Sequence, residues 1–172
     1  AGHARVHLLV NNAGVALGGR VDQVSQADFQ WLFGVNFWGV VNMSRAFLPL
    51  LRSAGEARLV NLSSLFGLIA PPGQAAYAAS KYAVRGFSDA LRHELEGSAV
   101  GVTTVYPGGV ATAIARNARM PSGASAQEAE LQLLLELLLG EPEVLHARVG
   151  RPVVVVPIPV GKRREGHRED RI

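Results

Sequence analysis

A tyrosine and a lysine four residues apart are the residues of this sequence best suited to proton transfer. Tyr77 and Lys81 lie in a stretch with a helical pattern, so their spacing places them on one helix face. A phenol has a pKa of about 10, and a neighbouring ammonium lowers that pKa because it favours the phenolate. The pair therefore predicts an acid/base catalyst adjusted towards neutral pH.

Composition singles out this lysine. The 172-residue chain contains fifteen arginines but only two lysines, Lys81 and Lys162. A lysine in a chain this rich in arginine indicates a function that needs a compact ammonium rather than a planar guanidinium. The Tyr-x-x-x-Lys spacing is common on its own, and a purely structural pair is the alternative that it leaves open.

Polar and small residues follow three predicted strands. Each strand is a short apolar run closed by a turn signal, and the three runs are 6–10, 58–62 and 100–106. The groups that follow them are Asn11-Asn12-Ala13-Gly14, Ser63-Ser64 and Pro107-Gly108. Taken singly, such groups are turn formers, a cap and a strand stop. Because ligands of parallel sheets bind at the carboxyl ends of the strands, together they predict a binding site.

The elements that must position these residues alternate between strands and helices. Helices are expected from Ser25, over 36–52, over 74–96 and, after a surface loop at 115–125, from Ser125 to Gly140, followed by a strand at 153–156. Strands that are apolar throughout imply a parallel sheet covered on both faces. We therefore predict an α/β, Rossmann-like three-layer domain over residues 1–160 and a charged, disordered tail over 161–172.

Composition argues against several other classes of protein. Cysteine is absent and the five histidines lack ligand spacing, so we expect no metal site and no disulfide scaffold. The tail carries +2 of the net charge of +3, and no basic stripe with aromatic residues occurs, so we expect no nucleic-acid partner. No leader is visible and no apolar run is long enough to cross a bilayer. We therefore expect a cytoplasmic protein without a membrane partner.

Taken in order and spacing, the motifs of residues 5–118 resemble those of the short-chain dehydrogenase/reductase family. The shared motifs are NNAG at 11–14, N-x-x-G at 36–39, a serine 13 residues before Tyr77, and P-G-x-V-x-T at 107–112. The resemblance implies reversible hydride transfer between NAD or NADP and a secondary alcohol or ketone. The apolar residues around Ser64 favour a small apolar alcohol or carbonyl substrate.

The resemblance also implies a role for each site residue. Tyr77 is expected to exchange a proton with the substrate oxygen, and Lys81 to lower the pKa of Tyr77 and bind the nicotinamide ribose. Ser64 is expected to position the substrate oxygen, and Asn36 to hold a water that links Lys81 to solvent. Asn11 is expected to brace the sheet as well. The other expected cofactor-binding residues are Asn11, Ala13, Gly14, Tyr77, Pro107, Gly108, Val110 and Thr112.

One motif of that family is missing. The glycine-rich T-G-x-x-x-G-x-G turn, which binds the cofactor pyrophosphate, occurs nowhere in the sequence. We therefore expect a family member that lacks its N-terminal strands, about 70–80 residues by typical domain size. The strand at 6–10 then becomes an exposed apolar edge, and the chain alone is expected to bind NAD(P) weakly or not at all.

A non-catalytic chain that acts by association is the alternative function. Members of the family often dimerise through two long helices, which match residues 37–52 and 74–96 here. A chain that lacks its N-terminal strands keeps both helices. We therefore expect a homo-oligomer formed through them, whether or not the chain catalyses a reaction.

Overall fold

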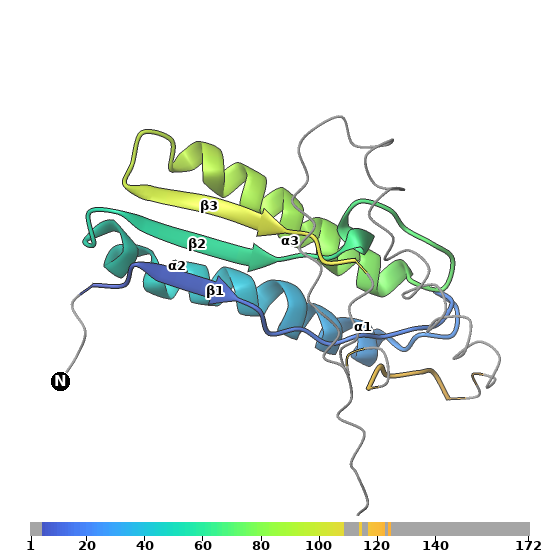
Figure 1. The fold of residues 1–172 in the computed structure, drawn as a ribbon. Helices are drawn as coiled ribbons and strands as arrows, with labels where there is room; N and C mark the ends of the chain where they lie inside the picture. Colours follow the sequence, from blue (N-terminus) through green and yellow to red (C-terminus); the bar gives the residue numbers. More distant parts are fainter. Residues whose placement is uncertain (1–4, 109–113, 115–116, 123, 125–172) are drawn as a thin grey trace, which may run out of the picture.

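Three strands form one parallel sheet in the computed structural model, which describes residues 5–108, 114, 117–122 and 124 (Figure 1). The strands are β1 (Leu8–Asn11), β2 (Ala57–Leu62) and β3 (Val100–Val105), and they lie side by side in the order β1-β2-β3. The predicted strands are therefore confirmed, with β1 displaced towards the carboxyl side. Val6 is outside the strand because its N–H bonds to the carbonyl of Leu50.

The helices occupy the predicted stretches. They are α1 (Gln26–Phe33), α2 (Gly39–Arg52) and α3 (Ala75–Glu94), with a single 3-10 turn, η2 (Leu65–Gly67), after β2. Ser25 begins α1 as its N-cap, because its hydroxyl accepts a hydrogen bond from the N–H of Asp28. A π-helical turn, η1 (Gly34–Trp38), joins α1 to α2 without a break, which the sequence pattern did not predict.

Helices α2 and α3 cover one face of the sheet, as Figure 1 shows. The main core between them consists of Leu9, Leu51, Ala57, Leu59, Leu91, Leu95, Val100 and Val102. Burial alternates along β1, so Leu8 and Val10 on the other face are exposed. Within the described residues the predicted cover therefore holds for one face only, and β1 is an apolar edge strand, as predicted.

Several predicted features lie outside the described residues. These are the leucine-rich helix from Ser125, the strand at 153–156, the tail at 161–172, and the site residues Val110 and Thr112. Among the helices that the structure describes, none has both the length and the hydropathy needed to cross a bilayer. The cytoplasmic location stays a prediction.

Two leucines on opposite faces of the sheet test this architecture. Leu59 in the central strand is fully buried, whereas Leu8 in β1 is 58% exposed. We expect Leu59→Ala to lower the free energy of unfolding by about 2–5 kcal/mol, because it leaves a cavity in the core. Leu8→Ala is the matched control, with a loss below about 0.5 kcal/mol. Equal losses in urea denaturation would contradict the assignment of the two faces.

Candidate active site

The carboxyl ends of the strands and the amino end of α3 meet at one end of the sheet (Figure 1). The N–H of Ser63 bonds to the carbonyl of Val105 at 2.8 Å, and the N–H of Leu65 to that of Pro107 at 2.9 Å. These bonds continue the pairing of β2 with β3 beyond the ends of both strands. The segments after the two strands are thereby held together, which places Ser64 next to the predicted cofactor-binding residue Pro107.

Tyr77 and Lys81 lie on the buried face of α3, as their spacing predicted. The Nζ atom of Lys81 lies 5.7 Å from the centroid of the Tyr77 ring and donates a hydrogen bond of 3.2 Å to the carbonyl of Leu62. The Tyr77 ring packs edge-on against Phe66, with 6.0 Å between ring centroids. The last residue of β2 and the turn after it therefore fix both side chains of the pair.

Burial lowers the pKa of Lys81 to about 8. The cause is desolvation, which disfavours the charged ammonium. None of the ion pairs formed by the described residues includes Lys81. The site thus holds an ammonium that is mostly charged at pH 7, close to an aromatic ring, with a backbone carbonyl to accept one of its protons.

Asn36 is buried in the π-helical turn and bonds to the segment after β1. Its Oδ1 accepts from the N–H of Val15 at 2.9 Å, and its Nδ2 donates to the Val15 carbonyl at 3.0 Å and to Ser80 Oγ at 3.1 Å. Because Ser80 precedes Lys81, these bonds connect the end of β1 to the buried face of α3. The side chain thus serves as a positioning group, and the predicted water relay stays a prediction.

Asn11 braces the sheet, as the sequence predicted. Its Nδ2 donates to Asn61 Oδ1 at 2.8 Å and to Ser44 Oγ at 3.2 Å, and Asn61 Nδ2 donates to Ser88 Oγ at 2.9 Å. Asn61 is also the register partner of Asn11. The network links β1, β2, α2 and α3. Sequence reasoning missed Asn61, although an asparagine inside the apolar run RLVNL was an available signal.

Both serines after β2 have structural partners. Ser64 Oγ accepts from the N–H of Phe66 at 3.1 Å and caps η2, which is the alternative that the sequence left open. A hydroxyl that accepts in this way keeps its own O–H to donate. Ser63 Oγ donates to the carbonyl of Lys81 at 2.9 Å. A Cβ at position 67 would collide with that Ser63 oxygen, so Gly67 allows η2 to pack against α3.

The predicted cofactor-binding residues that the structure describes lie at the strand ends. Gly14 faces the site: a Cβ there would come within 3.5 Å of Lys81 Nζ and 3.6 Å of Asn36 Oδ1. Ala13 is exposed, and Pro107 and Gly108 are half-buried after β3. Within the described part of the chain, no group of acidic, histidine or cysteine side chains is arranged to hold a metal ion.

Arg119 ties a distant segment to the site. Its backbone pairs with the loop after β1, through Gly18 N–H to Arg119 O and Arg119 N–H to Ala16 O, both at 3.0 Å. Its guanidinium lies 3.7 Å from the centroid of the Trp31 ring and 2.9 Å from Asp28 Oδ1. Residues 117–122, the described part of the surface loop predicted at 115–125, are exposed or half-buried and are held to the rest of the molecule by Arg119. No local pattern indicated these contacts.

The tether places apolar groups against the core cluster that contains Tyr77. A second core cluster contains Tyr77, Leu65 and Phe66, and Ile114 and Ala118 pack against it. The side of the site next to Tyr77 is thus apolar, whereas the side next to Lys81 is polar. The tether also affects Asp28, since hydrogen bonds from Ser25 and then Arg119 hold the pKa of Asp28 below its usual value.

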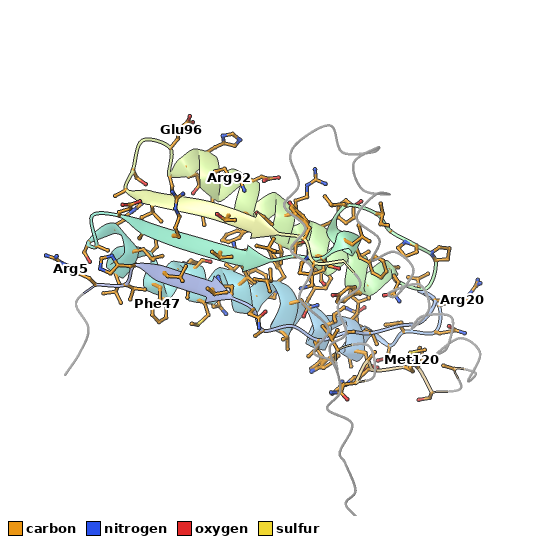
Figure 2. All side chains as sticks on the ribbon, in the orientation of Figure 1. Arg5, Arg20, Phe47, Arg92, Glu96 and Met120 are labelled. Carbon is orange, nitrogen blue, oxygen red and sulfur yellow. The ribbon has the colours of Figure 1, made fainter. Side chains whose placement is uncertain are left out.

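A concavity of about 590 Å³ lies at the opposite end of the sheet. It is lined by the amino ends of β2 and β3 and by the end of α3, including Arg92 and Glu96. Figure 2 shows these two side chains far from Arg20 and Met120, which lie towards the end of the molecule where α3 begins. Because parallel sheets bind ligands at the carboxyl ends of their strands, we do not assign the active site to this concavity.

Several known proteins are similar in sequence to this chain. The sequence profile of the family described as short chain dehydrogenase matches residues 1–122. The oxidoreductase SadH of Mycobacterium tuberculosis is 48% identical over 141 residues, which cover 81% of this chain and 51% of SadH. The 3-ketodihydrosphingosine reductase of Bacteroides thetaiotaomicron is 38% identical over 113 residues, 66% of this chain and 42% of that protein. The chain spans about half the length of the curated relatives it matches.

A solved structure supports the same relationship. A short chain dehydrogenase/reductase from Burkholderia phymatum, in complex with NAD, superposes with a TM-score of 0.71 at 33% identity. The match covers 84% of this chain and 59% of that chain. The predicted Rossmann-like parallel sheet is therefore confirmed.

The depressed pKa of Lys81 predicts how stability varies with pH. The unfolded chain binds a proton at this lysine up to a pKa of about 10.5, the folded chain only up to about 8. The charged, buried lysine therefore costs stability below pH 8, and stability is regained as the pH rises from 8 to 10.5. We expect Lys81→Met to stabilise the protein at pH 7 by up to about 3 kcal/mol, and this gain to vanish in that window.

Urea denaturation at several pH values measures this effect. Arg45→Met, which removes an exposed cation from α2, is the control and is expected to shift stability by less than about 0.5 kcal/mol. A Lys81→Met variant that is no more stable than the native chain at pH 7 would show that the ammonium is solvated.

Proposed function

The chain belongs to the short-chain dehydrogenase family, and on this premise we propose that it carries the proton-transfer machinery for the reversible oxidation of a secondary alcohol by NAD or NADP. The main support is the burial of Tyr77 and Lys81 together, 5.7 Å from ring to Nζ, at the carboxyl ends of the strands. A tyrosine next to a desolvated ammonium is suited to gain and lose a proton near neutral pH. The reverse reaction reduces a ketone.

Tyr77 acts as the general acid and base in this proposal. In the direction of reduction its O–H gives a proton to the carbonyl oxygen, and in the direction of oxidation the phenolate takes that proton back. The ammonium of Lys81 favours the phenolate through its charge. Ser64 donates its O–H to the same substrate oxygen and so fixes the direction from which Tyr77 approaches it.

A bound nicotinamide cofactor supplies or accepts the hydride in this chemistry. The residues near Lys81 fit such a group: the absence of a Cβ at Gly14 keeps space open beside Lys81 Nζ. Lys81, Gly14, Pro107 and Gly108 are the described residues that we assign to holding the cofactor, and Val110 and Thr112 stay predictions. Both amide hydrogens of Asn11 bond to Ser44 and Asn61, so we assign Asn11 to positioning only.

In this proposal the 172 residues bind the cofactor pyrophosphate more weakly than a chain with a glycine-rich turn does, because their sequence contains no such turn. NAD and NADP are both candidates, because the pyrophosphate is common to the two. We propose a substrate that is largely apolar, since Leu68 and Ile69 pack against the cluster that contains Tyr77. The name of the Bacteroides relative, a reductase of a keto compound, agrees with a ketone as the oxidised substrate.

Tyr77→Phe tests the catalytic proposal. The variant keeps the ring that packs against Phe66 but loses the only group that carries the proton. We expect kcat/KM for ketone reduction to fall at least about 100-fold, because general acid catalysis contributes that much or more. The measurement is NADH or NADPH oxidation by the 172-residue chain at millimolar cofactor.

Tyr82→Phe is the matched control, because Tyr82 lies on the exposed face of the same helix. It is expected to keep the native rate. Retained activity in Tyr77→Phe, or no turnover by the native chain at saturating cofactor, would rule out the proposed role of Tyr77.

Association through the long helices is the second candidate function. Three large apolar side chains are exposed on this part of the molecule: Trp38, Met43 and Tyr82. Phe37 and Phe87 pack edge-on at 6.3 Å, so α2 and α3 are joined beside them into one surface. Exposed apolar side chains on paired helices support a homo-oligomer that forms there.

Light scattering after size-exclusion chromatography tests this association. We expect the native chain to be a dimer at micromolar concentration and Trp38→Glu to weaken it at least about tenfold, because buried tryptophans dominate interface energies. Val21→Glu, at an exposed site outside these helices, is the control and should leave the dimer intact. A native monomer, or equal effects of both variants, would exclude the helices as the interface.

A further inference from the structure

Gln74 carries the single buried side-chain oxygen that lacks a hydrogen-bond partner in the described part of the chain. The residue is only 2% exposed, and its Oε1 meets no donor. It is the N-cap residue of α3, yet its side chain makes no capping bond. Its buried oxygen therefore has no partner in the first turn of the helix or among the described residues.

Three other buried side-chain amides of the described residues do have hydrogen-bond partners. Asn11, Asn36 and Asn61 each bond to two partner residues, at 2.8–3.2 Å. A buried polar atom without a partner destabilises the folded state, because the hydrogen bond to water that it loses is not replaced. An unpaired amide oxygen is therefore a candidate for bonding to a group that the protein does not itself contain.

The location of Gln74 relates that oxygen to the proposed catalytic residues. Gln74 stands one helical turn before Tyr77, and side chains three apart share a helix face. Long side chains in helices lean towards the amino end, which is the end of α3 that Gln74 occupies. The carbonyl of Gly73 accepts from Gly19 N–H at 2.9 Å, in the loop to which Arg119 is tethered. Gln74 therefore follows a residue that is bonded to the loop after β1.

The charges around the site select the kind of donor. The amino end of α3 is the positive end of its helix dipole, and Lys81 adds an ammonium on the same helix. Both disfavour a cationic donor such as an amine. A neutral hydroxyl is the donor that suits this environment, and it can serve either end of an amide.

We propose that Gln74 is a specificity-determining residue whose amide oxygen accepts a hydrogen bond from a substrate hydroxyl next to the reacting carbon. The inference rests on the proposed function and narrows its substrate to hydroxyketones and the corresponding diols. The carbon chain lies against the apolar side of the site, which includes Leu65 and Ile69, while the additional hydroxyl bonds to Gln74.

A matched pair of ketones tests this assignment. Acetoin and butanone differ by one hydroxyl on the carbon next to the carbonyl. We expect the native chain to favour acetoin at least about tenfold in kcat/KM, and Gln74→Met, which keeps the shape but not the acceptor, to lose that preference. The melting temperature of Gln74→Met should rise by about 2–4 °C, because the unpaired oxygen is gone. Gln74→Leu carries the same expectations if the methionine variant does not fold.

Binding without turnover separates this inference from the proposed function. Saturation-transfer NMR of each ketone with the chain, in the absence of cofactor, should show tighter binding of acetoin to the native chain than to Gln74→Met. Gln30→Leu, at an exposed glutamine of α1, is the control and should keep the native preference.

Each outcome either supports or overturns the assignment of Gln74. A native chain that turns over neither ketone but binds acetoin through Gln74 contradicts the proposed function and supports this inference. An acetoin preference that Gln74→Met leaves unchanged in both assays overturns it. A lower melting temperature with unchanged preference also overturns it, because Gln74 then has only a structural role, such as binding an ordered water.

Discussion

Burial of the Lys81 ammonium is the physical constraint on which the candidate site depends. Desolvation lowers its pKa to about 8, so the charge is kept at a cost that only close, fixed neighbours offset. The Leu62 carbonyl accepts one of its hydrogens, and the Tyr77 ring lies over it. Small residues stand next to these groups: Gly67 allows the turn after β2 to approach α3, and Gly14 places no side chain against the ammonium.

Two buried polar networks hold α3 in the place that this lysine requires. Asn36 connects the Val15 backbone to Ser80, the residue before Lys81. Asn61 connects β2 to Ser88, two helical turns further along α3. Since hydrogen bonds are directional, they fix the rotation and the axial position of the helix, which apolar packing alone leaves loosely defined. Tyr77 and Lys81 are therefore carried by a helix whose position is fixed.

The two faces of the sheet differ in how well the described residues cover them. The face of the sheet covered by α2 and α3 is packed, and the proposed proton-transfer residues Tyr77 and Lys81 lie on the buried side of α3. The other face exposes Leu8 and Val10, and the chain spans about half the length of its curated relatives. The unpaired oxygen of Gln74 adds a feature that concerns the substrate rather than the cofactor.

Local periodicity was sufficient to predict that Tyr77 and Lys81 share one face of a helix. A spacing of four puts Tyr77 and Lys81 on one helix face whatever the rest of the chain does, and the ends of apolar runs indicated where Asn11 and Ser64 would stand. The capping serine of α1 could be predicted for the same reason, since its partner is three residues away. The one-residue alternation of burial in β1, by contrast, depends on which face the helices cover.

Only the tertiary structure decided which side chains meet across the molecule. Asn36 bonds to a backbone 21 residues away, and Arg119 pairs with Asp28 across 91 residues, and no local pattern encodes such partners. The same is true of the buried oxygen of Gln74, because the lack of a partner is a property of its surroundings. Sequence periodicity determines the face on which a residue lies, whereas packing determines what that face contacts.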